Sequence, residues 1–157
     1  KDPMNSDIKK LLVSVHYYGP PAYSILSEDA GWANVTNSWG TAQEVKEQNT
    51  DFAQMQRFTN EGYGVIVGEY AVLMLKQSDG TYVRKNDDIK WMTNVLDNCD
   101  KYNYCPLIWE CNDYFKRGWK RVNSVDVKCE LGFVDLDVAE LFKNRSYAVE
   151  KAALTNE

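Results

Sequence analysis

The chain has 157 residues, of which 44% are hydrophobic, and this is enough for one domain with one core. Its net charge is −5, and no run of Lys and Arg forms the basic stripe that nucleic acids require, so no nucleic acid partner is expected. No stretch approaches the roughly 18 apolar residues of a membrane span, so no membrane partner is expected either.

Aromatic residues make up 13% of the chain, with ten Tyr and five Trp. This composition suits a surface that binds flat apolar faces, and it suits a Tyr-rich core equally well.

The cysteines give no sign of a metal or redox site. There are four of them, Cys99, Cys105, Cys111 and Cys129. No Cys-x-x-Cys pair occurs among them, which argues against a zinc knuckle or a thioredoxin-type site. Free buried thiols are the simplest interpretation.

Three short apolar runs predict buried strands. They cover residues 11–15, 65–68 and 106–109. Each run is almost continuously apolar, as expected of strands that are buried on both faces in a parallel sheet.

Helical patterns follow each of these runs. The first begins at Thr41, with Glu44 three residues later as in a capping box, and Gly62 stops it. The second spans about residues 86–99, with apolar positions at three- and four-residue spacing, and a third, short one covers residues 138–143. The order strand–helix, repeated three times, predicts an α/β fold of parallel strands joined by right-handed crossovers.

The long connections all leave the same ends of the predicted strands. The strand-to-helix loops span about residues 17–40, 70–85 and 110–134, whereas the helix-to-strand connections are only a few residues long. Loops longer than about 12–15 residues in a compact domain are usually functional or disordered. A functional site is therefore expected at the carboxyl ends of the strands.

Polar and aromatic residues stand at those strand ends. The first strand ends in His16-Tyr17-Tyr18, the second in Gly68-Glu69-Tyr70 and the third in Trp109-Glu110. A carboxylate at the end of an apolar strand is costly to desolvate unless it is paired or functional, so Glu69 is a candidate catalytic residue. Taken alone, the single His would more often be structural and the Trp would more often be core. Their occurrence at three consecutive strand ends favours a shared site.

These motifs also carry a family resemblance. The residues that match are His16-Tyr17-Tyr18-Gly19-Pro20, Ser38-Trp39-Gly40-Thr41, the run 64–70 and Pro106-Leu107-Ile108-Trp109. In this order they resemble the last three β/α units of family 5 glycoside hydrolases, and in particular the bacterial endoglucanase subgroup. The resemblance covers nearly the whole chain. It implies a partial (β/α)8 TIM barrel, with residues 1–157 as one domain that forms the C-terminal portion of the barrel.

The resemblance implies a role for each matched position. Glu69 would be the nucleophile of a retaining endo-1,4-β-glucanase, and Tyr18 would orient it by a hydrogen bond. His16, Trp39 and Trp109 would bind the substrate, with Trp109 as a platform under a sugar ring. No cofactor and no metal are implied, because hydrolysis by a pair of carboxyl groups needs none. The match is imperfect at Glu110-Cys111-Asn112-Asp113, where the relatives often have an acidic-polar-small run, and Glu110 is interpreted as a rim residue.

The acid/base is missing from the recognisable motifs. In the resembled family it is a Glu after Asn at the end of an earlier strand, and the pair Asn60-Glu61 here precedes the second strand, at the wrong end of the barrel. A chain of this length is also short of the roughly 250 residues typical of a closed barrel. The opening Lys1-Asp2-Pro3, with neither an initiator Met nor a signal peptide, suggests a mature, processed or truncated product.

The expected protein is therefore a glycoside hydrolase piece, inactive or weakly active when isolated. Expected partners are a β-glucan polysaccharide or oligosaccharide, and either the N-terminal portion of the same barrel or a second copy in a homodimer, because incomplete barrels leave strand edges exposed. The expected location is extracellular, after secretion from a bacterium. Two alternatives remain open, a carbohydrate-binding module without hydrolysis and a self-associating half-barrel.

Overall fold

The computed structural model describes residues 10–109 and 114–154. The chain divides into two compact units, Lys1–Trp109 and Glu110–Glu157. The sequence instead predicts a single domain over residues 1–157. Each unit is described by itself below.

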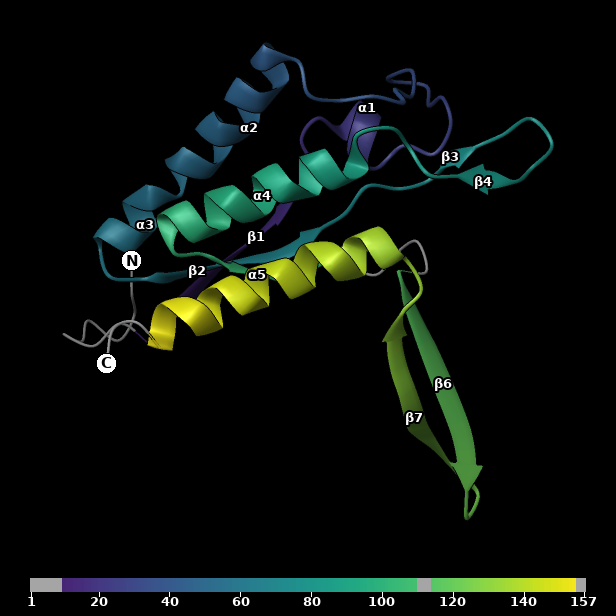
Figure 1. Cartoon of the computed structure of the whole chain (residues 1–157). Coiled ribbons are helices and arrows are strands. Elements are labelled where there is room, and N and C mark those ends of the chain that lie inside the picture. The colour runs from purple at the N-terminus through teal and green to yellow at the C-terminus, as the bar shows by residue number, and fades with distance from the viewer. Residues whose placement is uncertain (1–9, 110–113, 155–157) are drawn as a thin grey trace. The chain divides into compact units, whose positions relative to one another are not determined.

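A parallel three-stranded sheet forms the centre of the first unit. Its strands are β1 (Leu12–Tyr17), β2 (Gly64–Tyr70) and β5 (Cys105–Pro106), in the order β1-β2-β5, and both pairings are parallel. This confirms the predicted parallel α/β arrangement (Figure 1). The third strand is shorter than predicted, but backbone hydrogen bonds from Leu107 N to Val67 O and from Trp109 N to Tyr70 O continue its path along β2.

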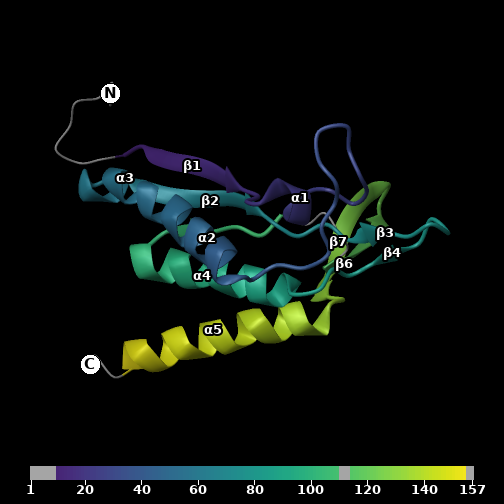
Figure 2. The same cartoon turned by 90° about the horizontal axis from the view of Figure 1, so that it is seen from above.

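Two helical segments run alongside this sheet. The first comprises α2 (Ala42–Gln54) and the short α3 (Gln56–Asn60), and the second is α4 (Asp88–Tyr102). The predicted capping box at the start of α2 is present, because the Thr41 side chain accepts from the Glu44 backbone N–H while the Glu44 carboxylate accepts from the Thr41 N–H. Helices α2 and α4 pack beside each other (Figures 1 and 2).

The core of the first unit lies between the sheet and these helices. Its fully buried members include Phe52, Val67, Tyr70, Trp91, Met92 and Val95. In β2 the buried residues Val65 and Val67 alternate with less buried ones, as expected when one face of a strand is covered. The covered face is the one toward α2 and α4. Packing against the helices therefore holds β1 and β2 in place, and with them the residues at their carboxyl ends.

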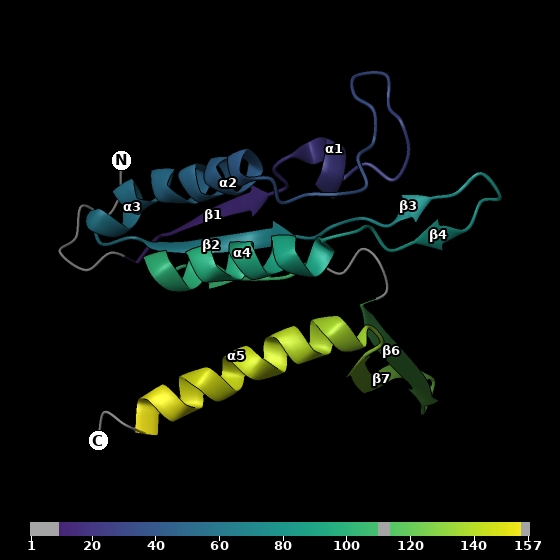
Figure 3. The same cartoon turned by 45° about the horizontal axis from the view of Figure 1, so that its top comes forward.

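The long connections of the first unit contain small elements. The short helix α1 (Pro21–Ser24) follows β1, and an antiparallel hairpin of β3 (Leu75–Lys76) and β4 (Tyr82–Val83) follows β2. Both extend beyond the carboxyl ends of β1 and β2 (Figure 3). The predicted loop over 70–85 is thus partly a hairpin.

The second unit contains a hairpin and a helix. Strands β6 (Phe115–Val122) and β7 (Val125–Phe133) pair antiparallel, and α5 (Leu136–Leu154) follows. The prediction of a loop over 110–134 is wrong for the described part of that range, and the helix is much longer than the predicted 138–143. Across the described residues, no helix combines the length and the apolar character that crossing a membrane requires.

Candidate active site

The ends of β1 and β2 place His16 opposite Glu69. The register pairs Val15 with Val67 and then His16 with Glu69, so Gly68 is an extra residue in β2 at this point. Such a bulge turns the strand and re-aims the side chains next to it. A Cβ at position 68 would lie 2.9 Å from Ser14 Oγ and 3.6 Å from His16 Cδ2, so a glycine here permits the close approach of the two strands. The local sequence therefore sets the direction of the Glu69 side chain.

Two side chains meet on one oxygen of Glu69. The Tyr18 hydroxyl donates to Oε2 at 2.9 Å, and His16 Nδ1 lies 3.1 Å from the same Oε2. The Glu69 side chain is 31% exposed and that of His16 is 55% exposed. The carboxylate is thus oriented by both neighbours and can be reached from solvent. Both contacts are made to Oε2, and neither is made to Oε1.

Trp109 stands next to this carboxylate site. Its ring centroid is 5.8 Å from that of Tyr18, with an edge-on angle of 76° between the planes. The indole is 44% exposed, and the backbone N–H of Trp109 donates to Tyr70 O at 3.0 Å. The ring is therefore held at the end of the sheet while much of its surface stays open. An open, fixed aromatic face is what a sugar ring needs for stacking.

Trp39 lies in a different environment. It is 4% exposed, and the Lys90 ammonium lies 6.0 Å from its ring centroid. Its backbone N–H donates to the Asp87 carboxylate at 3.3 Å. It has no open ring face on which a sugar could stack, so its position gives no support to the predicted binding role. The structure brings together the other four predicted residues, His16, Tyr18, Glu69 and Trp109.

A buried layer beneath the site positions Tyr18. Ser24 is fully buried and its hydroxyl donates to Tyr18 O at 2.5 Å. Tyr17, the residue before Tyr18, packs against Phe52 with ring centroids 4.7 Å apart and against Trp91 with ring centroids 5.9 Å apart. Burial, and then the charge of Asp51, raise the pKa of Tyr17, whose hydroxyl therefore stays neutral. Sequence reasoning did not identify Ser24 as a positioning residue.

The remaining sequence predictions concern carboxylates and metals. Glu110 lies outside the described residues. The pair Asn60-Glu61 ends α3, before β2 begins, while Glu69 is near the other end of that strand. Within the described residues, no group of three or more His, Cys, Asp or Glu side chains is arranged to hold a metal ion.

Enzymes of the (β/α)-barrel class carry their active site at the carboxyl edge of the parallel strands, which is where this carboxylate, His, Tyr and Trp lie. The family described as cellulase (glycosyl hydrolase family 5) matches residues 1–115. The chain therefore belongs to glycosyl hydrolase family 5. Among curated proteins, no significant match is found.

Solved structures show the same fold. A GH5-4 broad-specificity endoglucanase from an uncultured bovine rumen ciliate matches with a TM-score of 0.60 and 20% identity, over 86% of this chain and 39% of that one. The cellulose synthase subunit Z of Clostridioides difficile matches with a TM-score of 0.54 and 19% identity, over 69% and 37%. A hyperthermophilic endo-β-1,4-glucanase, solved in complex with substrate, matches with a TM-score of 0.52 and 17% identity, over 78% and 38%.

These likenesses confirm the predicted fold class, a partial (β/α)8 barrel. The chain spans less than two fifths of the length of each of these three proteins. The described site is therefore only part of the active site that a complete barrel would have.

Proposed function

We propose that this chain supplies the nucleophile of a retaining endo-1,4-β-glucanase, and that Glu69 is that nucleophile. The observation that carries the proposal is the pair of contacts on Glu69 Oε2, a hydrogen bond from Tyr18 at 2.9 Å and His16 Nδ1 at 3.1 Å. A nucleophilic carboxylate must be oriented and reachable, and the hydrogen bond from Tyr18 together with the close contact of His16 fixes its direction while leaving it partly exposed. Family membership supports the same chemistry.

The neighbouring residues take roles that follow from their positions. Tyr18 orients Glu69, because its hydroxyl is a directed donor to the carboxylate. His16 is more than half exposed and borders Glu69, so it can also contact the sugar next to the cleaved bond. Trp109 provides the stacking surface under a sugar ring. The substrate would be a β-glucan, as an endo-β-1,4-glucanase of the same fold has been solved with its substrate bound.

The acid/base would come from outside this chain. A retaining glycosidase needs two carboxyl groups about 5–5.5 Å apart, and one of them must protonate the leaving oxygen. The chain corresponds to less than two fifths of its structural relatives, so the second carboxyl would lie on the rest of the barrel. That part would be the N-terminal portion of the same enzyme. A second copy of this chain could cover the open sheet edges, but it would bring no acid/base of its own. The complete enzyme would act outside the cell, where a polymeric glucan is met first.

A substrate with an activated leaving group tests the nucleophile without the acid. In 2,4-dinitrophenyl 2-deoxy-2-fluoro-β-cellobioside, dinitrophenolate departs with the bonding electron pair and needs no proton. A Glu69 oxygen forms the new bond to C1 as the C1–O bond breaks, and the fluorine slows hydrolysis of the adduct. We expect the purified chain to gain the mass of one fluorocellobiosyl group, located by peptide mapping on Glu69.

Two variants control this experiment. Glu69→Gln should form no adduct. Glu61→Gln removes an exposed carboxylate before β2 and should be labelled like the parent chain. An adduct on any other residue, or equal labelling of the Glu69 variant, would contradict the proposed nucleophile.

The main alternative is a half-barrel that binds carbohydrate or associates with itself without hydrolysis. The observation that favours it is the open Trp109 ring, since stacking needs no carboxylate. If cello-oligosaccharides bind equally to the parent chain and to Glu69→Gln, and no adduct forms in either, this alternative replaces the enzyme proposal.

A further inference from the structure

Two long loops are joined into one structure at the carboxyl end of the sheet. They are residues 24–37, after β1, and residues 73–86, after β2, and we call them together the rim wall. Backbone hydrogen bonds connect them from Leu73 N to Ser24 O at 2.7 Å, from Lys76 N to Ser27 O at 2.8 Å and from Asn86 N to Asn37 O at 3.0 Å. In Figures 1 and 3 both loops lie at the end of the sheet toward which β1 and β2 point.

A buried lysine holds the rim wall together. Lys85 is 3% exposed, and its Nζ donates to Tyr23 O and to Leu26 O, both at 2.5 Å. The Tyr23 hydroxyl in turn donates to Asn86 O at 2.6 Å. At the surface, Lys76 Nζ pairs with the Glu28 carboxylate at 2.8 Å. With so many fixed contacts, the wall is a rigid support and not a free loop.

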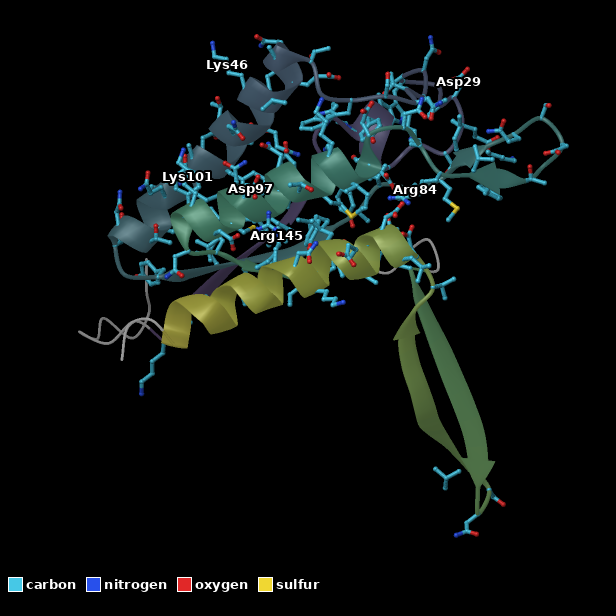
Figure 4. The ribbon with its side chains drawn as sticks, in the orientation of Figure 1. Asp29, Lys46, Arg84, Asp97, Lys101 and Arg145 are labelled. Carbon is cyan, nitrogen blue, oxygen red and sulfur yellow. The ribbon has the colours of Figure 1, made fainter. Side chains whose placement is uncertain are left out.

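Trp32 is presented at the tip of this support. Ala30 and Ala33 exchange two backbone hydrogen bonds, of 2.9 and 3.3 Å, which close a tight turn around it. The turn is fixed at its base, where Asp29 Oδ1 accepts the Val35 N–H at 2.8 Å (Asp29 is labelled in Figure 4). Trp32 itself is 62% exposed. A single exposed apolar residue is usual on a protein surface, but here a large indole stands on an ordered turn of the rim wall, at the carboxyl end of the sheet.

We propose that Trp32 is a stacking platform for a distal sugar ring of the same glucan whose bond is cleaved at Glu69. The inference rests on the proposed function, because it assumes that a β-glucan lies along the carboxyl edge of the sheet. A long glucan reaches past the residues around Glu69 and onto the rim wall, and a short one does not. Trp32 thus makes the site prefer longer chains, while Trp109 contributes to binding at any length.

Chain-length dependence of binding tests this platform. Titration calorimetry with cellobiose and with cellohexaose is carried out on the parent chain, on Trp32→Ala and on Trp109→Ala. Stacking of this kind is worth about a factor of ten in affinity, so Trp32→Ala should weaken cellohexaose binding about tenfold and leave cellobiose binding unchanged. Trp109→Ala should weaken both, and Trp32→Phe should restore most of the cellohexaose affinity.

The outcomes separate the platform from the proposed function. If Trp32→Ala binds cellohexaose as tightly as the parent while Trp109→Ala loses both ligands, the platform is wrong and the proposed function stands. If the parent chain binds neither oligosaccharide, the platform is wrong, and the labelling of Glu69 decides the proposed function separately. Because Trp32 is exposed, its replacement should leave the thermal unfolding midpoint unchanged, which shows that any lost affinity is not lost folding.

Discussion

At the scale of single residues, the Tyr18 hydroxyl is the contact through which the fold acts on Glu69, the proposed nucleophile. Its oxygen lies 2.9 Å from Glu69 Oε2, while its backbone carbonyl is held by the buried Ser24 hydroxyl. The position of Glu69 therefore depends on a chain of fixed contacts that leads into the core. Loss of one hydroxyl should then affect reactivity much more than stability.

Replacing Tyr18 by Phe tests this. A hydrogen bond to a charged group contributes about 1.5–3 kcal/mol, so Tyr18→Phe should slow labelling of Glu69 by the fluorocellobioside about 10- to 100-fold. The matched control is Tyr17→Phe, one residue earlier, whose hydroxyl contacts Asp51 and not Glu69. Labelling rates are measured by mass spectrometry over time. Equal slowing of both variants would mean that the effect comes from the strand and not from the contact with Glu69.

The sequence predicts the members of this site better than their surroundings. His16, Tyr18, Glu69 and Trp109 are predictable because parallel strands bring their carboxyl ends to one edge, whatever the details of packing. Their assigned roles stay predictions. The buried position of Trp39 is not visible in the sequence, because an aromatic residue in a loop has the same pattern whether its ring packs against Lys90 or faces solvent.

At the scale of elements, periodicity predicts the sheet and its helices but misses the second-unit hairpin. The turn between β6 and β7 consists of Asn123 and Ser124, with φ of 50° and 64°. Two such residues fit a hairpin turn of the primed type, although the usual signal is Asn-Gly. The β6 run carries charged residues at many positions and does not alternate, so it resembles a loop. The β7 run does alternate, with an apolar residue at every second position from Val125 to Phe133, and this is a strand signal. A search for turn pairs between β-branched and aromatic runs would have found this hairpin.

The rim wall gives an element-scale prediction about stability. Replacing Lys85 by Met leaves two carbonyl oxygens without their donor, and burial of an unsatisfied polar group costs about 1–3 kcal/mol. We therefore expect Lys85→Met to lower the free energy of unfolding by about that amount at neutral pH. Lys46→Met, on an exposed position of α2, should change it little. Urea unfolding followed by circular dichroism measures both.

Lys85 also makes stability depend on pH in a defined window. Burial lowers the pKa of its ammonium group to about 8, against 10.5 for an ordinary lysine. Between these values the unfolded chain binds more protons than the folded chain, so the free energy of unfolding rises with pH. Below pH 8 both states are protonated and this dependence disappears. The stability difference between the parent and Lys85→Met should therefore grow from pH 8 toward pH 10.5, and a constant difference would contradict the lowered pKa.

At the scale of the whole molecule, the three-stranded sheet leaves two edges and apolar surface uncovered. In the described residues β1 pairs only with β2, and β5 pairs only with β2, so both outer strands have open edges. Leu12 in β1 is 62% exposed and Leu107, just after β5, is 50% exposed. Open edges with exposed leucines favour association with another chain. In a complete barrel these surfaces would be covered by the remaining β/α units.

The purified chain should therefore associate with itself when the rest of the barrel is absent. Sedimentation velocity over a series of protein concentrations should show dimers or larger species, and the double variant Leu12→Lys with Leu107→Lys should shift them toward monomer, because a charge is costly to bury at an edge. Val83→Lys, on an exposed position of the β3–β4 hairpin away from the sheet edges, should leave the association unchanged. A monomer at every concentration would mean that the open edges are tolerated without a partner. In either case the acid/base would have to come from a separate N-terminal portion, because a second copy of this chain carries the same residues and no acid/base of its own.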